Sequence, residues 1–201
     1  MNRSTTPMVA IVLLVVGVLG MAATLFFVQP RGPVGPGMGT GRMDAMFIEQ
    51  MIPHHEDAIA MAEIALRRAE HPEITQLAEN VIRTQSEEIT QMRGWYREWF
   101  GVDVPDFDGS FGMMGRGSPG MMGGMMRGAV ADLDVLETAD EFDRLFIESM
   151  VPHHEMGIMM SRMIWNATDR PEMRGLAQSI IQSQSEEIDD MREWYEEWYG
   201  R

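Results

Sequence analysis

One stretch of sequence occurs twice in this chain, and the duplication limits the folds that the chain can adopt. Residues 44–101 recur without insertion as residues 143–200, so every position is displaced by 99. The clearest match pairs FIEQMIPHHE, which starts at Phe47, with FIESMVPHHE, which starts at Phe146. A segment repeated only twice favours two units that pack together in one domain over an extended solenoid.

Each copy has the residue pattern of two helices. In the first segment, positions on one helical face recur at spacings of three and four: Phe47, Met51, His54, Ala58, Met61 and Ala65. In the second segment the same spacing is kept by Leu77, Val81, Gln85, Glu88, Met92, Trp95 and Trp99. Pro53 predicts a kink or a break in a first helix that ends near His71. Pro72 and Pro171 suit the start of each second helix, and Gly101 and Gly200 suit its end.

We therefore predict an all-α protein, a ferritin-like four-helix bundle made from two antiparallel helical hairpins. The hairpins comprise residues 43–101 and 140–201, and a Gly/Met-rich crossover of residues 102–139 joins them. The methionine pairs of this crossover either capture a soft metal ion or belong to a low-complexity linker. Core and bundle-end packing is expected for the aromatic residues Trp95, Tyr96, Trp99, Phe100, Trp194, Tyr195, Trp198 and Tyr199.

The N-terminal part is predicted to anchor the protein in a membrane. Residues 8–28 form an apolar run without a charged residue, which is long enough to cross a bilayer as a helix. We assign residues 1–29 to this anchor and residues 30–42 to a Pro/Gly-rich tether, with the acidic bundle outside the cytoplasm. The alternative is a cleaved signal sequence, which would leave a secreted or periplasmic protein.

Composition excludes several kinds of site. The chain has no cysteine, so neither a disulfide nor a thiolate zinc site can form. Its net charge of −15 argues against binding nucleic acid, whose phosphates attract basic surfaces. Its 22 methionines serve either as core filler or as soft ligands suited to Cu(I).

The repeated Met-x-Pro-His-His-Glu segment predicts a duplicated metal site. Met51 precedes His54 and His55 by about one helical turn, and Met61 follows His54 by two turns. The predicted ligands are Met51, His54, His55, Met61, Met150, His153, His154 and Met160. Imidazole and thioether together suit copper, with Cu(I) preferred and Ag(I) or Cu(II) possible. In the alternative, the histidines satisfy a polar core and the methionines fill space.

A second group of residues could bind the metal or support its ligands. Gln85 and Glu88 lie on an otherwise apolar helical face, where an unpaired carboxylate is costly to bury. The second-rank candidates are Asp44, Gln85, Glu88, Met92, Asp143, Gln184, Glu187 and Met191. A Gln/Glu–His hydrogen-bond network without metal is the alternative. A di-iron carboxylate site ranks lower, because neither copy contains its Glu-x-x-His spacing.

The Met-x-Pro-His-His segment and the following Gln-x-x-Glu-Ile-x-x-Met-Arg-x-Trp segment resemble the DUF305 family, here in two tandem copies covering residues 44–101 and 143–200. This family includes CopM-like periplasmic copper-binding proteins and is classed as ferritin-like. The resemblance implies an extracytoplasmic helical bundle and copper or silver binding. By position, the residues that match the family motif are Asp44, Met51, His54, His55, Met61, Gln85, Glu88, Met92 and their counterparts 99 residues later. The crossover and the anchor depart from simpler members.

Together, these patterns predict a membrane-anchored metal-binding protein that sequesters or transfers copper, or confers resistance to it. We assign no catalytic residues. A copper-transfer partner would remain to be identified. The alternative is a structural or partner-binding helical bundle with a metal-free His/Glu network. A redox enzyme is a third possibility, for which no nucleophile or cofactor loop provides support.

Overall fold

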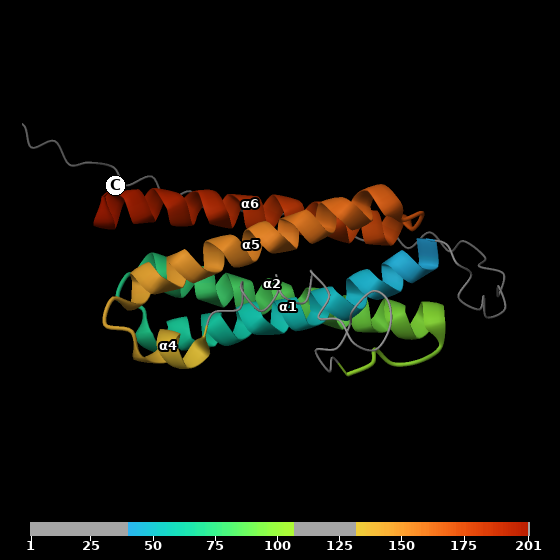
Figure 1. Cartoon of the computed structure of the whole chain (residues 1–201), viewed down its shortest axis with the longest axis horizontal. Coiled ribbons are helices and arrows are strands. Elements are labelled where there is room, and N and C mark those ends of the chain that lie inside the picture. Colours follow the sequence, from blue (N-terminus) through green and yellow to red (C-terminus); the bar gives the residue numbers. More distant parts are fainter. Residues whose placement is uncertain (1–39, 107–131, 201) are drawn as a thin grey trace, which may run out of the picture. The chain divides into compact units, whose positions relative to one another are not determined.

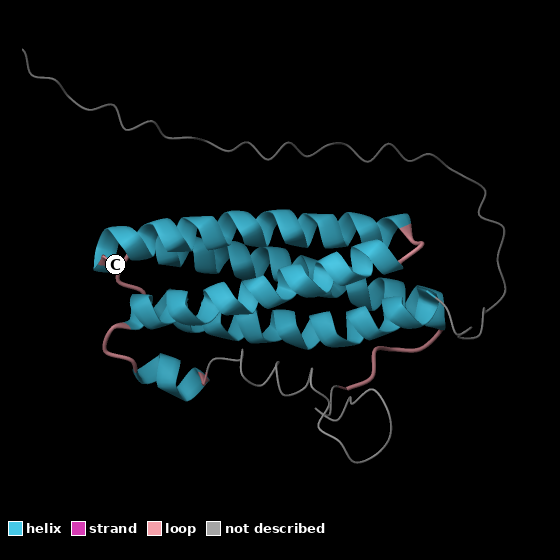
Figure 2. Ribbon diagram, turned by 45° about the horizontal axis from the view of Figure 1, so that its top comes forward, coloured by secondary structure: helices cyan, strands magenta, loops and turns pink. Residues whose placement is uncertain are grey.

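Four long helices form two hairpins that pack side by side (Figures 1 and 2). The computed structural model describes residues 40–106 and 132–200. The first hairpin consists of α1 (Thr40–Arg68) and α2 (Pro72–Phe100), and the second of α5 (Phe142–Ala167) and α6 (Pro171–Tyr199). A short helix, α4 (Leu133–Thr138), precedes the second hairpin. The contacts between the hairpins run mainly through α1 and α5, which confirms the predicted all-α bundle of two hairpins.

Proline and glycine set the helix limits largely as the sequence indicates. Pro72 and Pro171 occupy the first turns of α2 and α6, where a missing N–H has no cost. Gly101 ends α2 in the left-handed conformation with φ 75°, and its N–H donates to the Arg97 carbonyl. Pro53 does not break α1, which continues to Arg68, and α5 likewise continues through Pro152.

The bundle has two apolar clusters, one toward each end. The cluster at the Thr40 end includes Phe47, Ile48, Met51, Met92, Met160, Ile164, Met173 and Ile180. The cluster at the α4 end includes Met61, Ile64, Val81, Leu136, Phe142, Phe146, Met150 and Met191. The tryptophans and most of the other predicted aromatic residues pack against these clusters, which confirms their role in core and bundle-end packing. In each of the four long helices, a polar segment separates most residues of one cluster from those of the other.

Two clamps, one at each end of the bundle, hold the loop of one hairpin against the other hairpin. In the Asp143 clamp, the Asp143 carboxylate accepts hydrogen bonds from the Glu70 and His71 N–H groups and from His71 Nδ1. The His71 ring stacks on Trp198 with 3.7 Å between ring centroids. Because these groups come from both hairpins, the clamp orders the start of α2 by a tertiary contact instead of a local cap.

The Asp44 clamp repeats this arrangement with a different nitrogen donor. Arg170 occupies the position equivalent to His71, and its Nε donates to Asp44 Oδ2 at 3.1 Å. Its guanidinium lies 4.0 Å from the ring centroid of Trp99. The repeat of a carboxylate, a nitrogen donor and a tryptophan at both ends gives the bundle an approximate two-fold symmetry.

The helix α4 lies within the predicted crossover and was not anticipated. Asp132 caps it, because its carboxylate accepts from the Asp134 and Val135 N–H groups. Leu136 then inserts into the apolar cluster at that end. The Gly/Met segment of the crossover lies outside the described residues.

No helix in residues 40–106 and 132–200 has the length and apolar character needed to span a bilayer. The predicted anchor and most of the tether lie outside these ranges, so the anchor remains a prediction from sequence.

Replacing Asp143 by alanine is expected to lower the free energy of unfolding by about 1–3 kcal/mol, because two backbone donors lose their acceptor. Urea unfolding followed by circular dichroism measures this change. The matched control is Asp140→Ala, an exposed residue nearby, which should change stability by no more than about 0.5 kcal/mol. Equal stability of the two variants would contradict a stabilising role for the clamp.

Candidate metal centre

Four imidazoles lie in the middle of the bundle, between the two apolar clusters. His54 and His55 come from α1, His153 and His154 come from α5, and all four are buried. The His54 and His153 rings face each other with 3.8 Å between centroids and 30° between planes. His54 Nε2 lies 3.1 Å from the His153 carbonyl oxygen and donates to it. The predicted histidines of both copies therefore share one central region.

A carboxylate orients one imidazole in each hairpin. His55 Nε2 lies 2.7 Å from Glu88 Oε2, and His154 Nε2 lies 2.7 Å from Glu187 Oε2. An ionised carboxylate only accepts, so Nε2 carries the proton and Nδ1 keeps its lone pair in the neutral ring. Metal-binding histidines commonly have this arrangement, with a carboxylate on the nitrogen that does not bind the metal. The two glutamates thus act as partners of the histidines, as one of the sequence interpretations proposed.

Further contacts fix the register of the two helices in each hairpin. Tyr96 donates to Glu49 at 2.5 Å, and Arg93 donates to Glu56 at 2.7 Å. The same contacts recur in the second hairpin, from Tyr195 to Glu148 and from Arg192 to Glu155. Because these contacts lie on both sides of the His–Glu pairs along α1 and α5, they keep each glutamate beside its histidine.

The buried lone pairs are the clearest sign of a missing partner. The Nδ1 atoms of all four histidines are buried, and none has a hydrogen-bond partner among the described residues. Leaving a buried polar atom unpaired costs about 1–3 kcal/mol. A metal ion bound to Nδ1 would offset this cost, so the imidazoles fit a metal that accepts nitrogen ligands.

The methionines are divided between the two ends in a way that the repeat alone does not reveal. Met51 and Met61 of the first copy lie in different clusters, because they are on either side of the histidines in α1. Met51 shares its cluster with Met160 and Met92, whereas Met61 shares its cluster with Met150 and Met191. Each cluster therefore combines thioethers from both copies, on either side of the imidazoles.

The predicted carboxylate ligands Asp44 and Asp143 lie elsewhere. They belong to the two clamps, and Asp143 precedes His153 by ten residues, or about 15 Å along the helix. Among residues 40–106 and 132–200, no three His, Asp or Glu side chains are grouped as around one metal ion.

The two predicted glutamines, Gln85 and Gln184, are both buried, and Gln85 Oε1 has no partner among the described residues. Gln184 and Ser161 are buried, and the Gln184 amide and the Ser161 hydroxyl lack partners in the described part of the chain. A Cβ at position 157 would collide with Gln184 Oε1, so Gly157 makes room for this amide. The first copy has Ala58 and Ala62 in place of Gly157 and Ser161. The second copy is thus the more polar one beyond its histidines.

Burial favours the neutral form of His54 and His153. The pKa of His54 is lowered from 6.5 to about 3, mainly by burial and in addition by the proximity of His55 and His154. Burial also lowers the pKa of His153 well below its ordinary value, and His54 and His154 act in the same direction. A neutral imidazole retains the lone pair that a metal ion needs.

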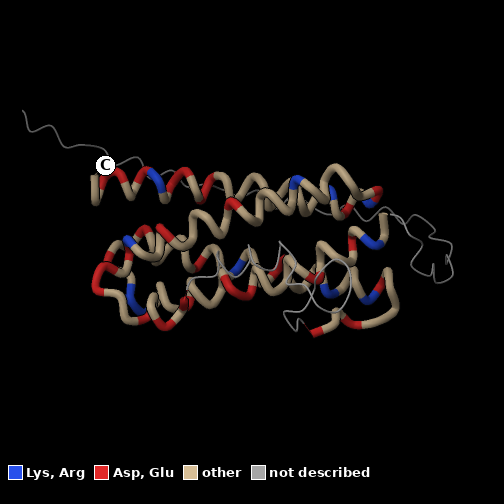
Figure 3. Tube along the Cα trace, viewed as in Figure 1, with Lys and Arg blue, Asp and Glu red and all other residues tan. Residues whose placement is uncertain are grey.

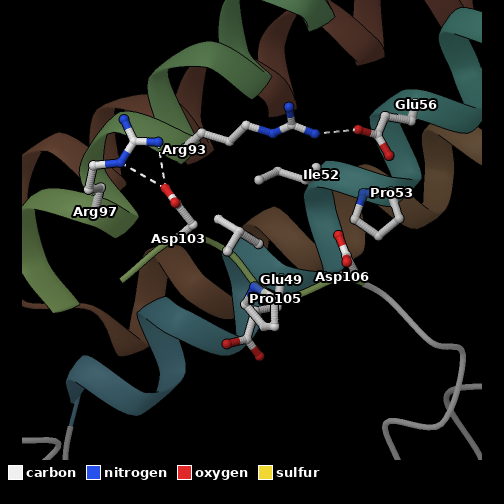
Figure 4. A pocket seen from close by; sticks show the side chains of 10 residues that line it. Glu49, Ile52, Pro53, Glu56, Arg93, Arg97, Asp103, Pro105 and Asp106 are labelled. Carbon is white, nitrogen blue, oxygen red and sulfur yellow. Dashed lines mark hydrogen bonds and ion pairs between the residues drawn. The ribbon is translucent and has the colours of Figure 1, made fainter. Parts of the chain in front are cut away.

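A cavity of about 310 Å³ lies on the outer side of the first hairpin, beside Pro53 (Figure 4). Its arginines are already paired, Arg93 with Glu56 and Arg97 with Asp103. None of the predicted ligands lines it. The chemistry of the buried histidines makes the bundle centre the stronger candidate site.

The depressed pKa of His54 predicts a loss of stability on acidification. Below pH 6.5 His54 becomes protonated in the unfolded chain, whereas in the folded protein it stays neutral down to about pH 3. Stability should therefore fall with pH in this window, by up to about 1.4 kcal/mol per pH unit for each such histidine. Urea unfolding at a series of pH values should give a flatter profile for His54→Gln than for the wild type. Parallel profiles would contradict this assignment.

Comparison with solved structures identifies close counterparts of this bundle. The silver-bound form of CopM is 47% identical, with a TM-score of 0.65 over 78% of this chain and 97% of the CopM chain. The Cu(I)-bound form of CopM is 46% identical, with a TM-score of 0.64. A putative secreted DUF305 protein from Streptomyces coelicolor is 25% identical, with a TM-score of 0.64 over 77% of this chain and 91% of its own.

Sequence comparisons agree with these structures. "Uncharacterized protein L153" of Acanthamoeba polyphaga mimivirus is 45% identical over 49 residues, which span 24% of this chain and only 32% of the viral protein. The model of the domain of unknown function DUF305 matches residues 44–195, which cover most of both hairpins. The chain belongs to the DUF305 family.

Proposed function

We propose that this protein binds copper or silver ions at the centre of the bundle and thereby sequesters or transfers copper outside the cytoplasm. Cu(I) and Ag(I) are the preferred ions, and Cu(II) is a further candidate. The bound ion is the cargo of the protein. No catalytic residue is assigned.

The observation that carries this proposal is the pair of His–Glu contacts, each of which leaves a buried Nδ1 atom without a partner among the described residues. Glu88 and Glu187 fix the proton on Nε2, which leaves Nδ1 of His55 and His154 buried and unpaired within the described residues. A purely structural network would be expected to pair these nitrogens, because buried polar groups in proteins are usually satisfied. The unpaired nitrogens favour a ligand role.

The adjacent methionines support a soft ion. Met51, Met92 and Met160 pack in one cluster, and Met61, Met150 and Met191 in the other. Thioethers bind Cu(I) and Ag(I) well and hard ions poorly, whereas imidazole suits copper in either oxidation state. The similar protein CopM has been solved with silver, Cu(I) and Cu(II), which supports the same class of cargo here.

The cellular location proposed here rests on sequence. The apolar residues 8–28 would hold the chain in a membrane, with the acidic bundle outside the cytoplasm. The alternative of a cleaved signal places the same bundle in the periplasm or outside the cell.

Replacing Glu88 and Glu187 together by alanine should weaken Cu(I) binding by about 10–100-fold, because the imidazoles lose the partners that orient them. Titration of the full-length protein against a chromophoric Cu(I) chelator measures this affinity. The matched control replaces the exposed neighbours Glu87 and Glu186 by alanine, which should leave the affinity unchanged. Equal affinities for the two double variants would argue against oriented histidine ligands.

A variant with His54, His55, His153 and His154 all replaced by alanine tests the proposal as a whole. If it remains helical by circular dichroism and binds Cu(I) as tightly as the wild type, the proposed centre is wrong. If it unfolds, Met61→Leu with Met150→Leu provides the second test, since leucine nearly conserves volume. Undiminished Cu(I) binding by this pair would exclude these two thioethers as ligands. A wild-type protein that binds no Cu(I), and whose melting temperature copper does not raise, would favour the structural bundle.

The anchor is tested by cell fractionation. The full-length chain should remain with the membrane fraction through washes with high salt and alkaline carbonate, because an apolar span is not released by either. Deletion of residues 1–29 should remove it from that fraction. If expression of the full-length chain instead yields a shortened protein in the soluble fraction, the N-terminal segment is a cleaved signal.

A further inference from the structure

The two ends of the bundle are related by approximate symmetry, but they differ in one surface. This surface is covered at the α4 end and exposed at the opposite end. At the α4 end, where α4 contacts α1 and α5, Ile64 and Phe142 share an apolar cluster with Leu136 of α4 and are 5% and 1% exposed. The equivalent residues 99 positions away are Met163 and Met43, which are 48% and 39% exposed. We call the surface around Met43 and Met163, at the start of α1 and the end of α5, the open face.

The sequence around the open face does not encode a second α4. Arg67 binds Glu137 and Arg68 donates to the Ala139 carbonyl, so both arginines hold α4 in place. Their equivalents, Asn166 and Ala167, carry no such charge. The residues that precede α1 at the positions equivalent to α4 read VGPGMG, with glycine in place of the anchoring Leu136. Glycine and proline are poor helix formers.

The charge beside these two positions is also reversed. Glu63 and Glu141 adjoin the surface that α4 covers, whereas Arg162 and Arg42 stand at the equivalent positions of the open face. Neither guanidinium has an ion pair or hydrogen-bond acceptor within residues 40–106 and 132–200. Acidic residues gather instead at the opposite end, around α4 and the end of α6 (Figure 3). The open face is therefore apolar, basic and far from the most acidic part of the bundle.

We propose that the open face docks on the surface of an anionic lipid bilayer. This inference rests on the membrane anchoring proposed above. The residues between the apolar run and Thr40 span at most about 40 Å when extended, so the open face at the start of α1 lies within reach of the bilayer.

Three contributions favour docking of the open face on the bilayer and set the orientation of the bundle. Methionine side chains gain by leaving water for the interfacial region. Arg42 and Arg162 gain by approaching anionic headgroups. The acidic residues at the α4 end are repelled by the same surface, so the long axis of the bundle points away from the membrane.

The absence of cysteine from the chain allows a direct test. Met163→Cys and, separately, Leu66→Cys are introduced into the full-length protein and labelled with an environment-sensitive fluorophore. Leu66 is the matched control, because it is exposed but lies at the α4 end. Each protein is reconstituted into vesicles of phosphatidylcholine with phosphatidylglycerol, and the fraction that floats with the vesicles is isolated. We expect a blue-shifted emission and loss of aqueous quenching for the label at 163 alone.

The outcomes separate this inference from the proposal on which it rests. Failure to float with vesicles would overturn both the anchor and the docking. Floating protein whose label at 163 is quenched as readily as the label at 66 would overturn the docking alone. Adding Arg42→Glu and Arg162→Glu should restore quenching at 163. Protection in detergent without vesicles, rising with protein concentration, would identify a second copy as the occupant and overturn the lipid assignment.

Discussion

Four imidazoles are buried between two apolar clusters, and the rest of the bundle is arranged around that constraint. Each ring has two nitrogens to satisfy, yet within residues 40–106 and 132–200 one glutamate in each hairpin contacts one histidine of this centre. Glu88 and Glu187 can reach their histidines only if α2 and α6 lie against α1 and α5 in a fixed register. The Tyr–Glu and Arg–Glu contacts on either side maintain that register. The Nδ1 atoms of all four rings stay buried without a partner among the described residues, and it is these atoms that the proposed soft ion would contact.

The sequence predicts what depends on a single helix or a single hairpin. The offset of 99 residues indicates two equal hairpins, and the three-four spacing places His54 and Glu88 on inward faces. The need of a buried carboxylate for a partner correctly suggests the histidines of the neighbouring helix. Proline and glycine mark the beginning and end of α2, because their effects on the backbone are local.

What the sequence does not predict depends on contacts between hairpins. Met51 and Met61 resemble ligands of one site when only one helix is considered, but the antiparallel pairing of α1 and α5 separates them and brings each near methionines of the other copy. Asp143 has the spacing of a helix-initiating or ligand residue, yet its partners are 72 and 73 positions away in the chain. The start of α4 does have a local signal, Asp132 followed by Leu133 and Leu136, which the glycine-rich composition of the crossover obscured.

A homodimer of two identical hairpins would have two identical ends. Both ends would then bind any given surface equally well. Joining both hairpins in one chain lifts this restriction, because each copy can then change by itself. The exchange of Glu63 for Arg162 and of Glu141 for Arg42 is a change of this kind. It gives the bundle a direction along its length, while the shared centre keeps the symmetry that the paired histidines require.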